Sequence, residues 1–274
     1  YLVSLVREDG TGWVGHPSEA PWDLIKDDVW ISHNRSFDMV VHAVLGLPMP
    51  KEWHCTADMV SWLQAPRSLQ MARDALDGVK VSKAVRDEMN GVQWSQCAED
   101  LKERVRQYAL ADGQHCLGLW KNHAHKWPEH ERRLSRQTTD IGMRGIRLDV
   151  PLLTKQIEVL KQALFRQQRL IPWIDEGKPT SPIHLARACR SAGIEPPKTT
   201  NAKDPRYDAW LEENSVKAPF VGAIRNIRSI NRLLTSMELM EVYRDGEFLR
   251  HPLLYCGAPH TGRWSGGTGD RGDG

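Results

Sequence analysis

The chain has 274 residues, of which 26% are charged and 40% are hydrophobic, and its formal net charge at pH 7 is +2. This length is sufficient for one large domain or two ordinary ones. No apolar run reaches the roughly 18 residues of a membrane-spanning helix and no signal peptide is visible, so a membrane partner is not expected. The five cysteines show no CxxC spacing, which argues against a disulfide framework or a zinc knuckle and predicts a cytoplasmic protein.

Charge is divided unevenly along the chain. Residues 1–132 contain 19 acidic and 15 basic side chains, whereas residues 133–274 contain 16 acidic and 22 basic ones. We therefore expect two modules, one suited to cations and the other to a polyanion. The chain begins with residues that predict a strand, without an initial Met, and it ends in a glycine-rich segment. We therefore expect it to be a piece of a longer protein, truncated at both ends.

Short strands alternate with helices in the first half. Residues 1–7 and 11–14 flank an Asp-Gly pair that favours a β-hairpin, and residues 29–32 predict a third strand. Residues 36–45 predict a helix that ends at Gly46. A longer helix is expected over residues 95–126, before a proline that blocks its continuation. This order predicts an α/β module.

The second half is predicted to be almost wholly helical. Asp149, Ser181-Pro182 and Asp204-Pro205 are start signals for three helices. A last long helix carries apolar residues at spacings of three and four. Its other face presents three arginines, which are either contacts for a phosphate backbone or simply a solvated helix face: Arg225, Arg228 and Arg232.

The segment Asn34-Arg35-Ser36-Phe37-Asp38 follows the third predicted strand and opens a helix. Sheets of α/β proteins place ligands at this edge, and an acidic side chain there can reach a metal ion. The alternative is that Asn34 and Asp38 only cap the helix.

Tyr108 and Asp112 are four residues apart on the long predicted helix and therefore share a face. That face continues a buried stripe through Leu101 and Val105, where a carboxylate is costly unless a positive group such as a metal ion compensates it. The alternative is that Asp112 lies just past the stripe and is solvated.

Together these two segments resemble the second and third motifs of the DEDD-type 3′–5′ exonucleases, in the tyrosine-bearing subclass that proofreads for family A DNA polymerases. Between them, residues 54–59 (HCTADM) resemble that family's short Asp-Thr-Met element, with the order of Asp and Thr altered.

The end of the chain carries the most specific resemblance. Residues 257–266 (GAPHTGRWSG) resemble the GA-x-x-TGR-W-S-G segment of phage-type family A, or DNA polymerase I-like, enzymes. Residues 142–149 are similar to the Gly-Ile/Val-x-Asp segment with which the polymerase domain of that family begins. Residues 180–182, 193–194 and 198–200 resemble the thumb region. The order of all these segments matches, and the resemblance spans essentially the whole chain.

The resemblance implies a fold class and a division of the chain. Residues 1–132 would be an α/β, ribonuclease H-like exonuclease module, N-terminally incomplete because the Asp-x-Glu motif of the first strand is not in the sequence. Residues 133–274 would be the start of the polymerase domain, a mainly helical thumb region and the TGR segment, without palm and fingers.

The resemblance also implies a chemistry for the intact enzyme. Two Mg²⁺ ions, for which Mn²⁺ can substitute, would hydrolyse the terminal phosphodiester of a DNA strand. Asp112 would hold the ion that carries the nucleophile and Asp38 the ion beside the leaving group. Tyr108 would orient the attacking water, and Asn34 would help to fix the substrate end.

The expected partner is DNA, both a single-stranded 3′ end and a primer–template duplex, bound by a monomer in the cytoplasm of the cell or of a phage host. The TGR residues Thr261, Gly262 and Arg263 would lie near the primer terminus, with the arginine on the minor-groove side. With two of the four exonuclease carboxylates, the chain alone is expected to be inactive. The alternatives are a catalytically inactive DNA-binding module of the same family and an unrelated α/β protein with chance motifs.

Overall fold

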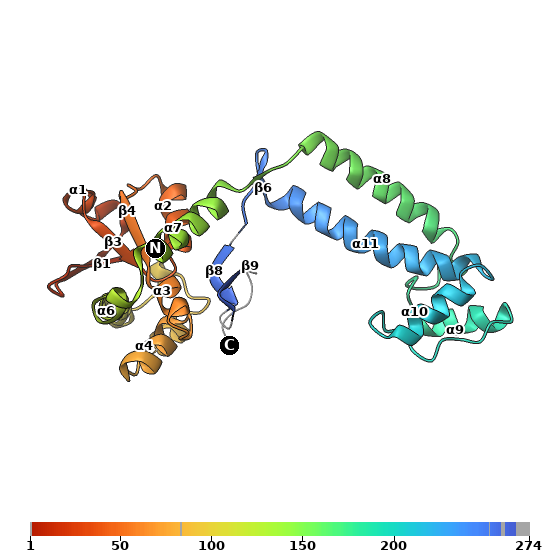
Figure 1. Cartoon of the computed structure of the whole chain (residues 1–274), viewed down its shortest axis with the longest axis horizontal. Helices are drawn as coiled ribbons and strands as arrows, with labels where there is room; N and C mark the ends of the chain where they lie inside the picture. Colours follow the sequence, from red (N-terminus) through yellow and green to blue (C-terminus); the bar gives the residue numbers. More distant parts are fainter. Residues whose placement is uncertain (1, 83, 252, 259–260, 267–274) are drawn as a thin grey trace. The chain divides into compact units, whose positions relative to one another are not determined.

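The computed structural model describes residues 2–82, 84–251, 253–258 and 261–266. These residues form two compact units (Figure 1). Unit 1 contains the described residues up to Gly145 and those from Arg250 onward, and unit 2 runs from Ile146 to Leu249.

Unit 1 contains two small sheets that include the predicted strands. Strands β1 (Val3–Val6) and β2 (Gly12–Gly15) form an antiparallel hairpin, and Gly10 in its turn has a φ of +89°, which glycine adopts without strain. Strand β3 (Val29–Ser32) pairs in parallel with β4 (Glu52–Cys55). The hairpin and the third strand were predicted correctly. The sequence interpretation had left β4 unassigned.

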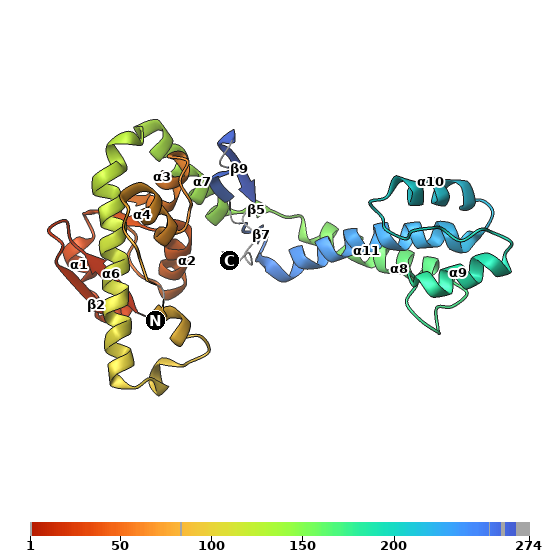
Figure 2. The same cartoon turned by 90° about the horizontal axis from the view of Figure 1, so that it is seen from below.

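Helices cover both faces of these strands. In Figures 1 and 2, α6 (Glu99–His123) lies along one face, whereas α2 (Arg35–Leu45) and α7 (Glu129–Arg144) lie on the other. Helix α6 begins later than predicted because a 3-10 turn (Trp94–Gln96) precedes it and Ala98 is extended. The other short elements are a 3-10 turn (Pro17–Glu19), α1 (Trp22–Ile25), α3 (Thr56–Trp62), α4 (Leu69–Asp77), α5 (Ala84–Glu88) and a 3-10 turn (Ala124–Lys126).

The core of unit 1 explains where this unit ends. Its buried apolar residues are Met59, Val60, Ala72, Leu119, Trp127, Tyr255 and Cys256. Tyr255 and Cys256 lie on β8 (Leu253–Ala258), which pairs with β9 (Arg263–Gly266), so this late hairpin belongs to unit 1. Helix α7 packs against β4 and β8. The division predicted after Arg132 therefore falls inside α7, and the compact units separate after Gly145 instead. The assignment of the two parts to exonuclease and polymerase domains stays a prediction.

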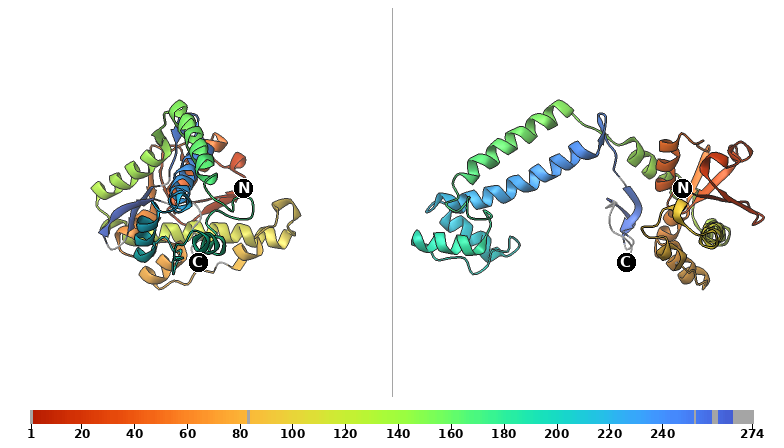
Figure 3. Two further views of the ribbon diagram at one scale, coloured as in Figure 1. Left: turned by 90° about the vertical axis from the view of Figure 1, so that its right-hand side faces the viewer. Right: turned by 180° about the vertical axis from the view of Figure 1, so that it is seen from behind.

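Unit 2 is mainly helical. Helices α8 (Val150–Gln168) and α11 (Pro219–Tyr243) lie side by side, with α9 (Pro182–Ser191) and α10 (Pro205–Asn214) at one end (Figure 3). The predicted starts are confirmed, because Asp149 caps α8 and Asp204 caps α10 through their side chains. Three short strands, β5 (Ile146–Arg147), β6 (Arg244–Asp245) and β7 (Phe248–Leu249), form a small sheet.

The main core of unit 2 lies where α9 and α10 meet the first half of α11. Its buried apolar residues are Ile171, Trp173, Leu185, Cys189, Ile194, Tyr207, Leu211, Ala218, Phe220, Val221, Ala223, Ile224 and Ile227. Among the described residues of the chain, no helix is long and apolar enough to cross a membrane.

Candidate functional site

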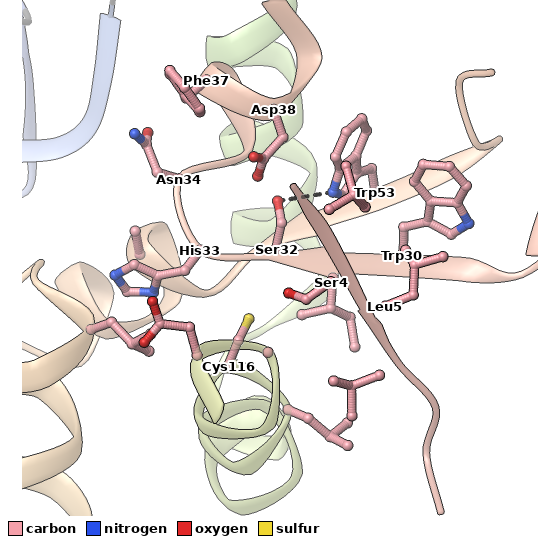
Figure 4. Close-up of a pocket in the computed structure, with 18 of the residues that line it drawn as sticks. Ser4, Leu5, Trp30, Ser32, His33, Asn34, Phe37, Asp38, Trp53 and Cys116 are labelled. Carbon is pink, nitrogen blue, oxygen red and sulfur yellow. Dashed lines mark hydrogen bonds between the residues drawn. The ribbon is translucent and has the colours of Figure 1, made fainter. Parts of the chain in front are cut away.

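A cleft of about 1970 Å³ opens in unit 1 between β1, β3, α2 and α6 (Figure 4). All four predicted exonuclease residues line it: Asn34, Asp38, Tyr108 and Asp112. Two of them come from the start of α2 and two from the middle of α6, about 70 residues later. The fold therefore brings the two sequence segments to one cleft.

The cleft runs along the edges of two strands. It is lined by every residue from 2 to 8 and from 28 to 34. Successive side chains of a strand point to opposite faces, so a cavity lined by all of them must follow the strand edge. In the described part of the chain β1 is hydrogen-bonded to β2 alone and β3 to β4 alone. Both edges along the cleft therefore lack a strand partner among the residues that the structure describes.

Asp38 lies in the first turn of α2, and its carboxylate is turned toward Ser32 (Figure 4). Burial disfavours the charged form and raises the pKa of this carboxyl to about 6, although a hydrogen bond with Ser32 opposes the rise. The Ser32 hydroxyl in turn accepts a hydrogen bond from Trp53 Nε1 at 3.0 Å. Asp38 is therefore a desolvated carboxylate that faces the Ser32 hydroxyl.

Asn34 occupies the position before α2 but does not cap it. Its φ is +74° and its side chain makes no capping bond to the helix backbone. Asparagine tolerates this left-handed conformation better than most residues do. Its Oδ1 accepts a hydrogen bond from Ser36 Oγ at 3.0 Å, and the residue is exposed. The Asn34 side chain therefore does not cap α2.

Tyr108 and Asp112 are hydrogen-bonded to each other on α6. Burial and, secondarily, the charge and hydrogen bond of Asp112 raise the pKa of Tyr108 to about 12. One turn further along the helix, burial raises the pKa of the Cys116 thiol to about 12, and the charges of both Asp38 and Asp112 add to that rise. Both carboxylates therefore act on the same buried thiol.

Two carboxylates are the kind of ligand that Mg²⁺ or Mn²⁺ prefers, but a complete site needs more oxygen atoms. Within the described ranges, no three His, Cys, Asp or Glu side chains gather as a group that could hold a metal ion. The carboxylates in the cleft thus have the chemistry that a divalent ion requires, but they are too few to complete a metal site.

Asp58, in the altered Asp-Thr-Met element, has a structural role that the sequence did not reveal. It is only 3% exposed. It accepts hydrogen bonds from Arg67 and, at 2.5 Å, from Ser135 Oγ. Arg67 Nη1 also donates to the Tyr255 carbonyl at 3.1 Å. This network joins α3, α7 and β8, and it satisfies a buried charge as such charges require.

The TGR residues lie on the β8–β9 hairpin. Thr261, Gly262 and Arg263 are all exposed, and Gly262 has a φ of +62°, as a tight turn requires. Thr261 Oγ1 accepts a hydrogen bond from Arg263 Nε at 3.1 Å. The neighbouring motif residues 259 and 260 lie outside the described residues, as do residues 267–274.

The three arginines of α11 differ from one another. Arg225 and Arg232 are exposed. Arg228 instead donates through Nη2 to the Thr200 carbonyl at 3.1 Å, and its guanidinium lies 4.9 Å from the ring centre of Tyr207. Arg228 therefore packs against the core of unit 2, and its role as a DNA contact loses support. The prediction had treated the three as one face because their spacing places them within one side of a helix.

No protein-family model matches the chain, and no curated protein matches it either. Among solved structures, the chain is similar to the polymerase domain of Pol1 from M. smegmatis, solved in complex with a DNA primer-template and dNTP. The TM-score is 0.64 at 16% sequence identity, over 96% of this chain and 47% of the other. The chain thus spans about half of that polymerase chain, and the similarity establishes the fold: a mixed α/β, mainly helical structure resembling a polymerase domain.

Proposed function

We propose that the chain is part of a family A DNA polymerase of the phage type, and that the cleft of unit 1 is its 3′–5′ proofreading exonuclease site. The observation that carries this proposal is that Asp38 and Asp112, from two distant segments, line one cleft together with Tyr108 and Asn34. The fold similarity to a polymerase domain that was solved with a DNA primer-template supports the broader assignment.

The two unpaired strand edges suggest how the site would be completed. A strand added between β1 and β3 would satisfy both edges, and side chains on one of its faces would reach the cleft near Asp38 and Asp112. An Asp-x-Glu pair on that strand would place two further carboxylates on the same face. The four carboxylates together would hold two Mg²⁺ ions, which in such a pair activate a water and stabilise the leaving oxygen.

The chain's own residues would prepare the site. Asp112 holds the Tyr108 hydroxyl at the cleft, where it can orient a water molecule beside this carboxylate. Asp38, turned toward Ser32, presents its carboxylate from the opposite wall. Asn34 is exposed and lines the cleft, and its side-chain amide can bind the end of a DNA strand.

DNA would be held by exposed arginines outside the cleft. Arg263 on the β8–β9 hairpin and Arg225 and Arg232 on α11 can neutralise phosphates, so duplex binding should weaken as salt increases. The chain as it stands lacks two of the four carboxylates, and we expect no measurable nuclease or polymerase activity from it because the loss of such electrostatic groups typically costs orders of magnitude in rate.

The test compares three forms of the protein on a labelled single-stranded oligonucleotide with Mg²⁺: this chain, the chain extended at its N-terminus by a strand that carries Asp-x-Glu, and the extended chain with Asp112→Ala. We expect 3′–5′ digestion only by the second form. Robust digestion by the short chain, or digestion by the extended chain that survives Asp112→Ala, would overturn the proposal.

A second candidate is a catalytically inactive DNA-binding module of the same family. Such a module would not need a metal ion, and the described residues contain no group of three metal-binding side chains. The same assay separates the two candidates, because an inactive module would bind duplex DNA and would stay inactive after the strand is added.

A further inference from the structure

We propose that Ser32 is a positioning residue for Asp38, and that the indole N–H of Trp53 fixes the direction in which the Ser32 hydroxyl points. This inference rests on the proposed function, in which Asp38 is a metal ligand. Neither Ser32 nor Trp53 belongs to the motifs that carry the family resemblance.

The direction of the Ser32 hydroxyl follows from the donors and acceptors around it. An indole nitrogen can only donate, so in the 3.0 Å bond between Trp53 Nε1 and Ser32 Oγ the oxygen must be the acceptor. The single hydroxyl hydrogen of Ser32 then remains available for its second neighbour. That neighbour is the carboxylate of Asp38, which faces the Ser32 hydroxyl in Figure 4, and a hydrogen bond from Ser32 lowers the pKa of this carboxyl against the effect of burial. An ionised carboxylate can only accept a hydrogen bond. The Trp53 indole therefore donates to Ser32, and the Ser32 hydroxyl donates to Asp38.

Trp53 is itself held firmly. Its side chain is buried at 6% exposure, and its ring meets Trp30 and His42 edge to face at centroid distances of 5.4 and 5.2 Å. Its carbonyl accepts a hydrogen bond from Arg35 Nη1 at 2.9 Å. Ser32 is the last residue of β3. A donor held on three sides can aim its hydroxyl, because a serine hydroxyl hydrogen rotates to suit its partners.

Such outer contacts matter because a metal ligand that can rotate binds its ion more weakly. Groups that orient the ligands typically change metal affinity by about 10- to 100-fold when they are removed. Removing the Ser32 hydroxyl would release Asp38 and would also leave the buried Trp53 N–H without its acceptor. Both effects give the Asp38 side chain more conformational freedom.

Four variants of the chain as it exists test this inference. Ser32→Ala removes the hydroxyl, and Ser32→Thr keeps it with a side chain that strands accommodate. Trp53→Phe removes the indole donor and keeps an aromatic ring. Trp30→Phe is the matched control, because the indole of Trp30 belongs to the same aromatic cluster but donates to the Ile25 carbonyl. Denaturant unfolding confirms that each variant is folded.

Two measurements are made on each variant. The Hα–Hβ scalar couplings of Asp38, measured by NMR without metal, report whether its side chain occupies one rotamer. Mn²⁺ titration followed by water-proton relaxation, with Asp38→Ala as the reference for a lost ligand, reports metal affinity. We expect Ser32→Ala and Trp53→Phe to average the couplings and to weaken Mn²⁺ binding by about tenfold. Ser32→Thr and Trp30→Phe should behave like the parent chain.

The two measurements separate failure of this inference from failure of the proposed function. If Ser32→Ala leaves the Asp38 couplings and the Mn²⁺ affinity unchanged while Asp38→Ala abolishes binding, Ser32 does not position Asp38 and the exonuclease proposal survives. If Asp38→Ala binds Mn²⁺ as the parent does, the metal role of Asp38 fails and this inference fails with it. If the parent binds no Mn²⁺ because the site is incomplete, the Asp38 couplings decide, and unchanged couplings in Ser32→Ala overturn the positioning role.

Discussion

Tyr108 donates a hydrogen bond to Asp112 across one turn of α6, and both residues line the unit 1 cleft. The bond requires the phenolic proton, and the nearby carboxylate disfavours a phenolate, so the pKa of Tyr108 is raised to about 12, with burial as its main cause. The tyrosine therefore stays a neutral donor even at alkaline pH values where an ordinary tyrosine, with a pKa near 10, ionises.

Replacing Asp112 should therefore lower the pKa of Tyr108. Asp112→Asn removes the charge and keeps a possible acceptor, so we expect the pKa to move from about 12 toward, but not to, the ordinary value near 10, because burial remains. The measurement is an NMR titration of ¹³Cζ-labelled tyrosine, with circular dichroism to verify the fold at alkaline pH. Asp100→Asn, an exposed change on the same helix, is the control. An unchanged Tyr108 titration in Asp112→Asn would show that the two residues are not coupled.

Neutralising Asp38 should stabilise unit 1 above pH 6. Its folded-state pKa of about 6 exceeds the value near 4 in an unfolded chain. The folded form therefore binds the proton more tightly, and stability falls as pH rises from about 4 to 6. Asp38→Asn removes this penalty, so we expect a gain of at most about 3 kcal/mol at pH 8 and no gain from this source at pH 3.5.

Urea unfolding at both pH values checks this expectation. Asp23→Asn, an exposed change on α1, should alter the free energy of unfolding by less than about 0.5 kcal/mol. Equal stability of the parent and Asp38→Asn at pH 8 would mean that Asp38 is not desolvated in solution.

The network around Asp58 should be important for stability. Asp58→Asn leaves the Arg67 guanidinium without its buried partner and weakens the acceptor of Ser135, so we expect a loss of about 3 kcal/mol in the free energy of unfolding. The matched control is Asp27→Asn, which breaks the exposed 3.0 Å ion pair with Lys51 and should cost less than about 1 kcal/mol. Similar losses in the two variants would contradict a structural role for the network.

The arginines should divide into DNA contacts and a packing residue. Arg263→Ala and Arg232→Ala should each weaken binding to duplex DNA and reduce the slope of log affinity against log salt by about one. Arg228→Met should instead lower stability, because Arg228 is held by Thr200 and Tyr207. Fluorescence anisotropy at several salt concentrations and thermal unfolding provide the two measurements. A salt slope unaffected by Arg263→Ala and Arg232→Ala would remove both from the DNA surface.

The local elements could be predicted from the sequence because their signals are local, whereas the roles of the candidate site residues stay a prediction. The Asp9-Gly10 pair predicted the first hairpin, and Asp149 and Asp204 marked the starts of α8 and α10. These features depend on hydrogen bonds and backbone conformations within a few residues, so neighbouring residues are enough to specify them. The spacing of Tyr108 and Asp112 likewise fixed their shared face, since a helix turn brings residues four apart together.

Only the tertiary structure decided which segments that are distant in the sequence contact one another. Helix α7 packs against β4 and β8. Strand β8 belongs to unit 1 because Tyr255 and Cys256 complete a core whose other residues lie between Met59 and Trp127. Arg228 differs from Arg225 and Arg232 because of an aromatic ring on α10, and Asp58 owes its buried role to Arg67 and Ser135. Burial and pairing of this kind are set by packing between distant segments, which leaves no periodic trace in the sequence. The helix spacing that grouped the three arginines could not contain that information.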